Sequence, residues 1–231
     1  MTSHSHIHRD VALDEMRGYG VLMMIVFHLI YDLNYFHFTQ IALFQDTAYI
    51  LWRWTIVAIF LNAVGITLVI KYRYADFKHF SKCLIKLAIV VVLLSLLTYL
   101  SVPKQWIYFG ILHLILLSSL IAFFFVKYPN IAFIVAASIL IAKFFNLPDL
   151  SILSLSLQGF LPSSTLDFYP LFPWLAMVLT GVYLAYHPWY KKIFFTQFGV
   201  LQFLGRNALV VYLTHQIFLF GGVYLAAQMM S

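Results

Sequence analysis

Charge is scarce in this chain of 231 residues. Asp, Glu, Lys and Arg make up only 10% of it, whereas hydrophobic residues make up 63%. A soluble domain usually carries about 25% charged residues, so the composition excludes an ordinary soluble protein. The single cysteine, Cys83, excludes a disulfide framework, and no metal-binding motif surrounds it, so we expect no metal site. The sequence predicts an all-α, polytopic integral membrane helix bundle.

The N-terminus lacks the hydrophobic core and the small-residue cleavage site of a signal peptide, so we expect the first membrane helix to direct its own insertion. Residues 1–13 are polar and rich in histidine. They predict a solvated cytoplasmic tail, with weak metal binding as the alternative. Seven hydrophobic stretches follow: 16–36, 48–70, 83–102, 107–127, 130–147, 170–187 and 206–229. Because no internal repeat is visible, we predict one domain over 1–231, with an amphipathic outer connection over 148–168.

Basic residues fall in alternate loops between these stretches. The loops after the second, fourth and sixth stretches and the start of the seventh hold most of them: Lys71, Arg73, Lys78, Lys82, Lys127, Lys191, Lys192 and Arg206. The positive-inside rule therefore places the N-terminus in the cytoplasm and the C-terminus outside, as about seven crossings require. The net charge of +6 arises in these loops. It bears on orientation, and we expect no nucleic-acid partner.

The first hydrophobic stretch carries a stripe of polar residues. At 100° per residue, Asp14, Arg17, His28 and Asp32 all fall on one side of a helix. Ionisable residues inside a membrane are costly and usually mark a polar path or an active site. His28 and Asp32 are also four residues apart, so the carboxylate can orient the imidazole. A histidine paired in this way can act as a general base.

Further polar and aromatic side chains fall at mid-depth or in the outer half of the predicted helices. The candidates for contact with a substrate are Arg53, Asp167, Tyr169, Trp174, Tyr212 and Gln216, and two more histidines, His113 and His215, accompany them. Plainer interpretations stay open for several of these. Asp32 and Arg53 are candidates for a structural ion pair, either histidine can be satisfied by helix backbone, and Tyr169 and Trp174 can simply mark a rigid helix start.

Four motifs occur in order along the chain. They are D-x-x-R-G-x-x-x-x-x-M-x-x-F-H-x-x-Y-D-L at 14–33, F-G-I-L-H at 109–113, Y-P-L-F-P-W at 169–174 and G-R-N-A-L-x-x-Y-L-x-H-Q at 205–216. Together they resemble a bacterial family related to the catalytic domain of heparan-alpha-glucosaminide N-acetyltransferase. That family is part of a wider group of transmembrane acyltransferases, and the resemblance covers nearly the whole chain.

The resemblance implies acyl transfer across a membrane, most simply a bacterial cytoplasmic (inner) membrane. The donor would be cytoplasmic acyl-CoA, with acetyl-CoA as the simplest case, and the acceptor a sugar hydroxyl or amine at the outer face. Arg17 and Arg206 would pair with CoA phosphates, which suit the guanidinium group. His28 would be the base or a transient acyl carrier, oriented by Asp32. His113 and His215 would support it or stabilise an oxyanion.

The chain also departs from the family pattern. The lysosomal enzyme carries an asparagine where His28 aligns, and its proposed catalytic histidine follows the first helix. By that alignment His37 is a rival for the catalytic role. The chain is short for the wider group and lacks an extracytoplasmic domain to choose an acceptor, so a second copy of the chain is a candidate partner beside the lipid bilayer.

Two other functions fit the same polar residues. A small proton-coupled transporter or permease would use the Asp/His/Arg path of the first helix as a proton relay. It would usually show paired halves and broken helices, which this sequence lacks. A non-catalytic membrane subunit would use the polar residues only to hold helices together. Release of CoA distinguishes the enzyme from both.

Overall fold

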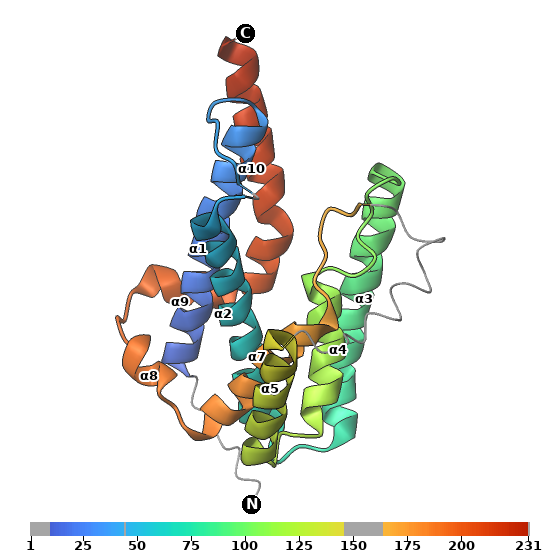
Figure 1. Ribbon diagram of the computed structural model, residues 1–231, viewed down its shortest axis with the longest axis vertical. Helices are drawn as coiled ribbons and strands as arrows, with labels where there is room; N and C mark the ends of the chain where they lie inside the picture. The colour runs from blue at the N-terminus through green and yellow to red at the C-terminus, as the bar shows by residue number, and fades with distance from the viewer. Residues whose placement is uncertain (1–9, 44, 146–163, 231) are drawn as a thin grey trace, which may run out of the picture. The chain divides into compact units, whose positions relative to one another are not determined.

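Regular structure is helical throughout the residues that the computed structural model describes, which are 10–43, 45–145 and 164–230. Figure 1 shows the order of the elements. The helices are α1 (Val11–Tyr35), α2 (Thr47–Tyr72), α3 (Phe77–Ser101), α4 (Ile111–Phe123), α5 (Pro129–Phe144), α7 (Leu171–Tyr186), α8 (Tyr190–Ile193), α9 (Gly199–Arg206) and α10 (Ala208–Met230). The all-α class predicted from the sequence is confirmed.

Each of the seven hydrophobic stretches coincides with one of these helices. Four of them, α1, α2, α3 and α10, are long and apolar enough to cross a membrane. The other three, α4, α5 and α7, are apolar but shorter, so seven is an approximate number of crossings. The predicted connection over 148–168 lies outside the described residues up to position 163. The predicted tail over 1–13 is described only from Asp10, and α1 already begins at Val11.

Contacts divide the chain into two compact units. The first comprises Met1–Phe60 and Pro188–Ser231, and the second comprises Leu61–His187. Helix α2 contributes its beginning to the first unit and its remainder to the second. The single domain predicted from the sequence stays a prediction.

The first unit is built around α1, which contacts α8, α9 and α10. Helices α1 and α10 run in the same direction. His28 lies beside His215, and Phe36, just past the end of α1, lies beside Phe220. The two helices therefore begin on the same side, as the first and seventh crossings of the predicted topology do.

Aromatic packing joins α1 to the beginning of α2. Phe27 and Tyr49 stack with their ring centroids 4.4 Å apart, and the Tyr49 hydroxyl donates a 2.7 Å hydrogen bond to the Phe27 carbonyl. Met24, Leu43 and Ile56 complete this buried cluster. Ring stacking and a satisfied phenol together give the pair a defined geometry, so the cluster fixes α2 against the middle of α1.

Two glycines let α9 approach the backbone of α1 closely. A Cβ atom on Gly18 would overlap the Leu201 carbonyl oxygen and lie 2.6 Å from its carbon. A Cβ atom on Gly205 would overlap the Asp14 carbonyl oxygen and lie 2.7 Å from its carbon. Small residues at a helix crossing permit this backbone contact. Both glycines belong to the sequence motifs, so the motifs specify the crossing itself.

In the second unit, α4 contacts α3 and α7, and α5 contacts α7. The segment before α4 runs beside the segment before α7, because Tyr169 donates its backbone N–H to the Phe109 carbonyl at 3.2 Å. The Asp167 carboxylate accepts a 2.8 Å hydrogen bond from the backbone N–H of Ile111, at the start of α4. These contacts satisfy backbone groups at the helix N-terminus that have no partner within the helix.

Candidate functional site

The four sequence motifs meet in two pairs, one in each unit. The first motif lies on α1 and the fourth on α9 and α10, and these helices contact one another in the first unit. The second and third motifs lie where the segments before α4 and α7 run side by side in the second unit. The ionisable residues of the first pair form two clusters along α1, and they make up the candidate site.

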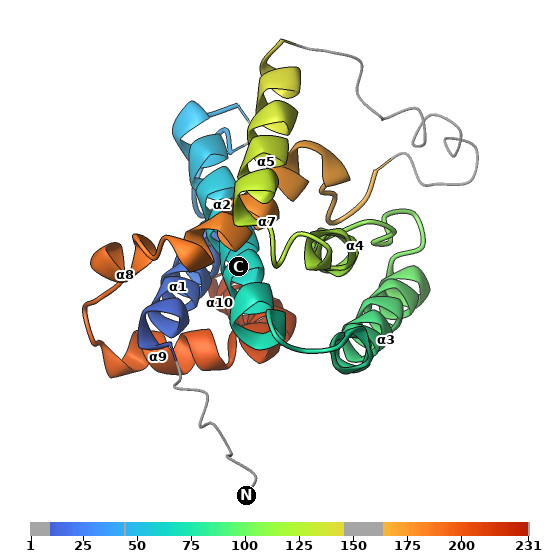
Figure 2. The ribbon, with the colours of Figure 1, turned by 90° about the horizontal axis from the view of Figure 1, so that it is seen from below.

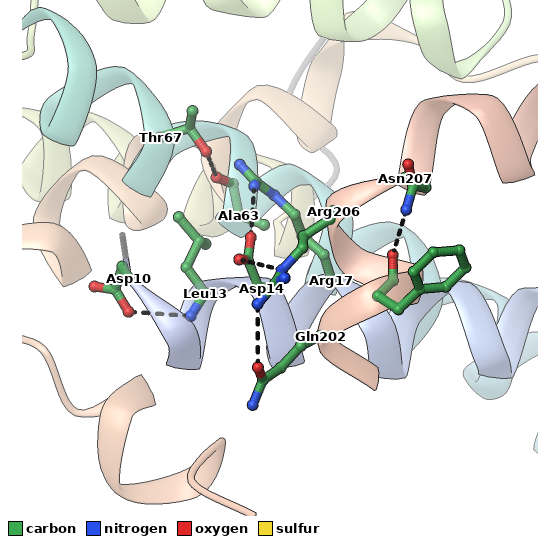
Figure 3. A network of polar contacts seen from close by, with 10 residues as sticks. Asp10, Leu13, Asp14, Arg17, Ala63, Thr67, Gln202, Arg206 and Asn207 are labelled. Atoms are coloured by element: carbon green, nitrogen blue, oxygen red, sulfur yellow. Dashed lines mark hydrogen bonds and ion pairs between the residues drawn. The ribbon is translucent and has the colours of Figure 1, made fainter. Parts of the chain in front are cut away.

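The first cluster lies near the start of α1 and joins one acid to two arginines (Figure 3). The Asp14 carboxylate lies 3.7 Å from Arg17 Nη1 and 3.6 Å from Arg206 Nε. Arg206 also donates from Nη2 to Gln202 Oε1 at 3.3 Å. Asp14 is buried, whereas 25% of the Arg17 side chain and 44% of the Arg206 side chain are exposed. The arginines therefore share an internal anion and still present donors to solvent. The sequence analysis assigned both arginines to the binding of CoA phosphates, and in the structure both lie beside Asp14.

Glu15 is a buried carboxylate that the sequence analysis missed. Its Oε2 accepts hydrogen bonds from the backbone N–H of Thr196 at 2.9 Å and from the Thr196 hydroxyl at 3.3 Å. Its Oε1 accepts a 3.1 Å hydrogen bond from Gln202. The sequence did offer one signal for it: a second acidic residue directly after Asp14, at the edge of a predicted membrane helix. Its partners lie more than 180 residues away in the sequence, so they were not visible there.

Asp10 ties the N-terminus of α1 to α8. Its carboxylate caps the helix by accepting from the backbone N–H of Leu13 at 3.1 Å, and it accepts from the Tyr190 hydroxyl at 2.6 Å. Lys191 lies 2.9 Å away. Burial raises the pKa of Asp10, but these hydrogen bonds and the lysine charge outweigh burial and hold the pKa below its ordinary value. Burial, and the hydrogen bond to Asp10, raise the pKa of Tyr190.

The second cluster is a histidine pair in the middle of the first unit. The rings of His28 and His215 lie edge to face, with centroids 4.9 Å apart. The Nδ1 atom of His215 lies 2.7 Å from the Tyr212 carbonyl oxygen and 3.1 Å from the Val211 carbonyl oxygen. Carbonyl oxygens only accept, so Nδ1 carries the proton and Nε2 of the neutral ring is left as an acceptor. That buried Nε2 has no hydrogen-bond partner among the described residues.

Asp32 lies in the same cluster but has a different partner from those expected. Its Oδ1 accepts a 2.8 Å hydrogen bond from Gln216, and its buried Oδ2 has no partner among the residues described. No ion pair joins Asp32 to Arg53 among the described residues, and the buried Arg53 Nε has no hydrogen-bond partner there either. Asp32 makes no hydrogen bond to His28 either. A carboxylate four residues after a histidine lies on the same face of the helix. Here, however, the Asp32 carboxylate accepts its hydrogen bond from the Gln216 amide on α10.

A shallow pocket opens at the C-terminal end of α1. Its volume is about 330 Å³, and its lining includes Tyr31, Asn34, Tyr35 and Gln45. Phenol, amide and apolar groups converge there, a mixture typical of small-molecule sites. Asn34 Oδ1 holds the pocket's loop by accepting from the backbone N–H of Ile41 at 2.8 Å. The sequence analysis proposed none of these as site residues, although Tyr31 lies in the first motif.

Four of the predicted site residues, His113, Asp167, Tyr169 and Trp174, belong to the second unit. His113 accepts from the backbone N–H of Gly110 at Nδ1, 3.2 Å away, and its Nε2 lies 3.0 Å from the Ser95 hydroxyl. The Nδ1 contact caps the start of α4 and leaves the proton on Nε2, and the Nε2 contact joins α4 to α3. Asp167 binds the start of α4, and the rings of Tyr169 and Trp174 lie edge to face at 5.9 Å. The backbone of Phe172 is non-helical, as expected for a segment between Pro170 and Pro173.

His37, the rival catalytic residue, lies on an exposed turn just after α1. Its φ is 63°, in the left-handed region. Within residues 10–43, 45–145 and 164–230, no group of three or more His, Cys, Asp or Glu side chains is placed to hold a metal ion.

Comparison with known proteins gave one match. The model of a family described as heparan-alpha-glucosaminide N-acetyltransferase, catalytic, matches residues 9–217. No curated protein and no solved structure matched the chain.

Proposed function

Because the chain belongs to the family of the heparan-alpha-glucosaminide N-acetyltransferase catalytic domain, we propose that it is an integral membrane acyltransferase. It moves an acyl group, most simply acetyl, from acyl-CoA to a sugar hydroxyl or amine. The observation that carries this proposal is the arrangement along α1 of an arginine pair, a histidine pair and a pocket. The family match does not favour the transporter that the polar path also suggested.

The donor binds at the arginine pair. Arg17 and Arg206 face one carboxylate, and both ion-pair distances exceed 3.5 Å, so neither contact is tight. A CoA phosphate brings more negative charge than Asp14 and matches the planar guanidinium donors. From Arg17 to His28 the axis of α1 rises by about 16 Å. A long, linear carrier such as the pantetheine arm of CoA suits that separation.

The histidine pair supplies the base. The acceptor's hydroxyl or amine gives its proton to an unprotonated imidazole nitrogen, and its oxygen or nitrogen attacks the thioester carbonyl carbon. The carbon–sulfur bond then breaks, and CoA leaves as a thiolate that takes up a proton. His28 is the reacting ring. His215 lies next to it, and its Nε2 has no hydrogen-bond partner among the described residues. Asp32 stabilises the positive charge that the pair acquires. His113 anchors α4 and takes no part.

The acceptor binds at the pocket by Asn34, about 9 Å further along the helix axis than His28. A volume of about 330 Å³ suits a monosaccharide unit, and the phenols and amides there can bond to sugar hydroxyls. Tyr212, whose ring lies near His215, and Gln216, which donates to Asp32, are assigned as acceptor contacts near the histidine pair. Arg53 and Trp52, near the start of α2, are assigned as donors for the reacting oxygen, because a buried side-chain nitrogen of each has no hydrogen-bond partner among the described residues.

Sidedness follows from the basic loops. The start of α1, with the arginine pair, is cytoplasmic and meets acyl-CoA, and the end of α1, with the pocket, faces outward. The membrane is most simply a bacterial inner membrane. Acyl transfer then modifies a carbohydrate on the side where CoA is absent.

The first experiment measures acetyl-CoA binding and acetyl transfer by the purified protein in nanodiscs. Glucosamine is the test acceptor because it offers both an amine and hydroxyl groups. Replacing Arg17 or Arg206 by Ala weakens acetyl-CoA binding, whereas His28→Ala leaves binding intact and lowers transfer by about 10²–10⁴-fold, the usual contribution of a general base. CoA release is read in a Cys83→Ser background, which removes the protein's own thiol.

A matched histidine control is His79→Ala. His79 is exposed at the start of α3, outside the candidate site, so its loss leaves both binding and transfer unchanged. A folded wild-type protein that fails to bind acetyl-CoA would refute the proposal. A His28→Ala protein with full transfer would refute the assignment of the base, and His37→Ala would then be the next variant to assay.

A further inference from the structure

The segment from Trp189 to Arg206, here called the α8–α9 segment, lies across the end of the first unit instead of along it. Only Asn207 separates α9 from α10, and its backbone N–H and side-chain amide both bond back to the Phe203 carbonyl. In the view of Figure 2, α10 is seen nearly end-on while α9 is seen from its side. If α10 crosses the membrane, α9 therefore runs roughly in the plane of the membrane surface.

One face of this segment is apolar and has no covering within the first unit. On α9, Leu201 and Gly205 face α1 and are buried. The opposite face and the chain before it carry large apolar side chains that are each 62–72% exposed: Trp189, Ile193, Phe195, Phe198, Val200 and Phe203. So many exposed aromatic side chains on one short segment mark a surface that meets an apolar partner.

Basic side chains accompany this apolar face. Lys191 and Lys192 are both exposed, and Lys192 makes no ion pair with any described residue. Lys191 lies against Asp10, and Arg206 keeps nearly half of its side chain exposed. Tryptophan and phenylalanine on one face with lysine and arginine beside them are typical of helices that lie in a membrane interface. The cations fit anionic lipid headgroups, which attract basic segments beside a membrane helix.

We propose that the α8–α9 segment is a lipid-binding element that lies in the headgroup region of the leaflet where α1 and α10 begin. Its aromatic side chains enter the boundary of the acyl chains, and its lysines bind the phosphates of anionic lipids. This binding does not depend on the enzymatic activity proposed above.

Hydrogen bonds through the buried Glu15 tie the segment to the candidate donor site. Glu15 on α1 accepts from Thr196 and Gln202 at 2.9–3.3 Å, and Gln202 in turn accepts from Arg206. The element that meets the lipid therefore also carries one of the two arginines.

A spin label tests where the segment lies. With Cys83→Ser removing the single native cysteine, Phe203→Cys carries the label, and its accessibility to dissolved oxygen and to a water-soluble nickel complex reports depth in nanodiscs. Phe218→Cys, on the exposed face of α10, gives the membrane reference. Asp76→Cys, exposed just before α3, gives the aqueous reference. The label at position 203 is expected to show the same high accessibility to oxygen and low accessibility to nickel as the label at position 218. If the label at position 203 were as accessible to the nickel complex as the label at position 76, the proposal would be overturned.

Lipid charge is tested with the same label. In discs of phosphatidylcholine alone the label is expected to lie nearer to water than in discs with added phosphatidylglycerol, and Lys191→Gln with Lys192→Gln removes the difference. Equal depth in both lipids contradicts the assignment of anionic headgroups. Val200→Cys, on the same face, provides the measurement if Phe203→Cys does not fold.

Discussion

The close crossing of α1 and α9 makes Gly205→Ala the most informative single substitution. The added methyl group points directly at the backbone of Asp14, where it overlaps the carbonyl oxygen and lies 2.7 Å from the carbonyl carbon. Ordinary van der Waals contact begins at about 3.4 Å. The two helices must therefore separate by at least about 0.7 Å, and more to clear the oxygen. Backbone atoms cannot swing aside as a flexible side chain can.

The clash sets the expected change in the free energy of unfolding of Gly205→Ala. Overpacking of this kind costs about 1–3 kcal/mol. The change from glycine to alanine in a helix returns up to about 1 kcal/mol through helix propensity. Gly221→Ala in α10 has the same propensity gain and no clash, because nothing lies within 4 Å of its added methyl group. The free energy of unfolding of Gly205→Ala is therefore expected to lie about 1–3 kcal/mol below that of Gly221→Ala.

Reversible unfolding in mixed detergent micelles, followed by circular dichroism, measures both variants. Gly18→Ala is expected to behave like Gly205→Ala, because it meets the Leu201 carbonyl from the other side of the crossing. If Gly205→Ala proves as stable as Gly221→Ala, then α9 does not touch α1 as described. The contacts of Asp14 with Arg206 would then fall as well.

Three further outcomes follow from the same unit. If Asp14 competes with phosphate for the arginines, Asp14→Asn tightens acetyl-CoA binding in a titration, and weaker binding would show that the carboxylate instead holds the arginines in place. Because the pKa of Asp10 is lowered from 3.8 in the folded state, its stabilising contribution is complete above that pH and is lost as the pH falls through the folded value. Asp10→Asn therefore removes that part of the acid sensitivity of unfolding, because the amide keeps a capping oxygen but carries no charge, and an unchanged pH profile would contradict the charged contacts of Asp10. Asp10→Ala loses the capping oxygen as well, and with it about 1 kcal/mol at neutral pH. Tyr49→Phe loses the bond to the Phe27 carbonyl and about 0.5–1.5 kcal/mol of unfolding free energy, and a neutral result would mean that this bond does not form.

Much of the fold was predictable because membrane helices are specified locally. A run of about 20 apolar residues is both the length that crosses a bilayer and a segment that must satisfy its own backbone hydrogen bonds. The helices accordingly match the hydrophobic stretches to within a few residues at most ends. The larger differences are at two helix starts: α1 begins at Val11 instead of 16, and α3 begins at Phe77 instead of 83, where two lysines made the first turns look like a loop. The family relationship was also predictable, since four motifs in order identify it and the family match confirms it.

The candidate site was predictable only in part. Helical periodicity placed Asp14, Arg17, His28 and Asp32 on one face of α1, and the structure gives each of them a neighbour on α1, α9 or α10. Periodicity acts within one helix and does not reach across helices. Predicted depth in the membrane suggested Arg53 as a partner of Asp32, but the rotation and register of α10 bring Gln216 there.

The amino-acid sequence by itself determined that this is a helical membrane protein of a known acyltransferase family, because apolar length and motif order are local properties. Tertiary structure decided which polar groups meet. It separated His215, which lies beside His28, from His113, which joins α4 to α3, although both looked alike in the sequence. It also buried Glu15 against Gln202. Such pairings depend on how closely helices approach and how each is rotated, and only packing between distant segments sets those two quantities.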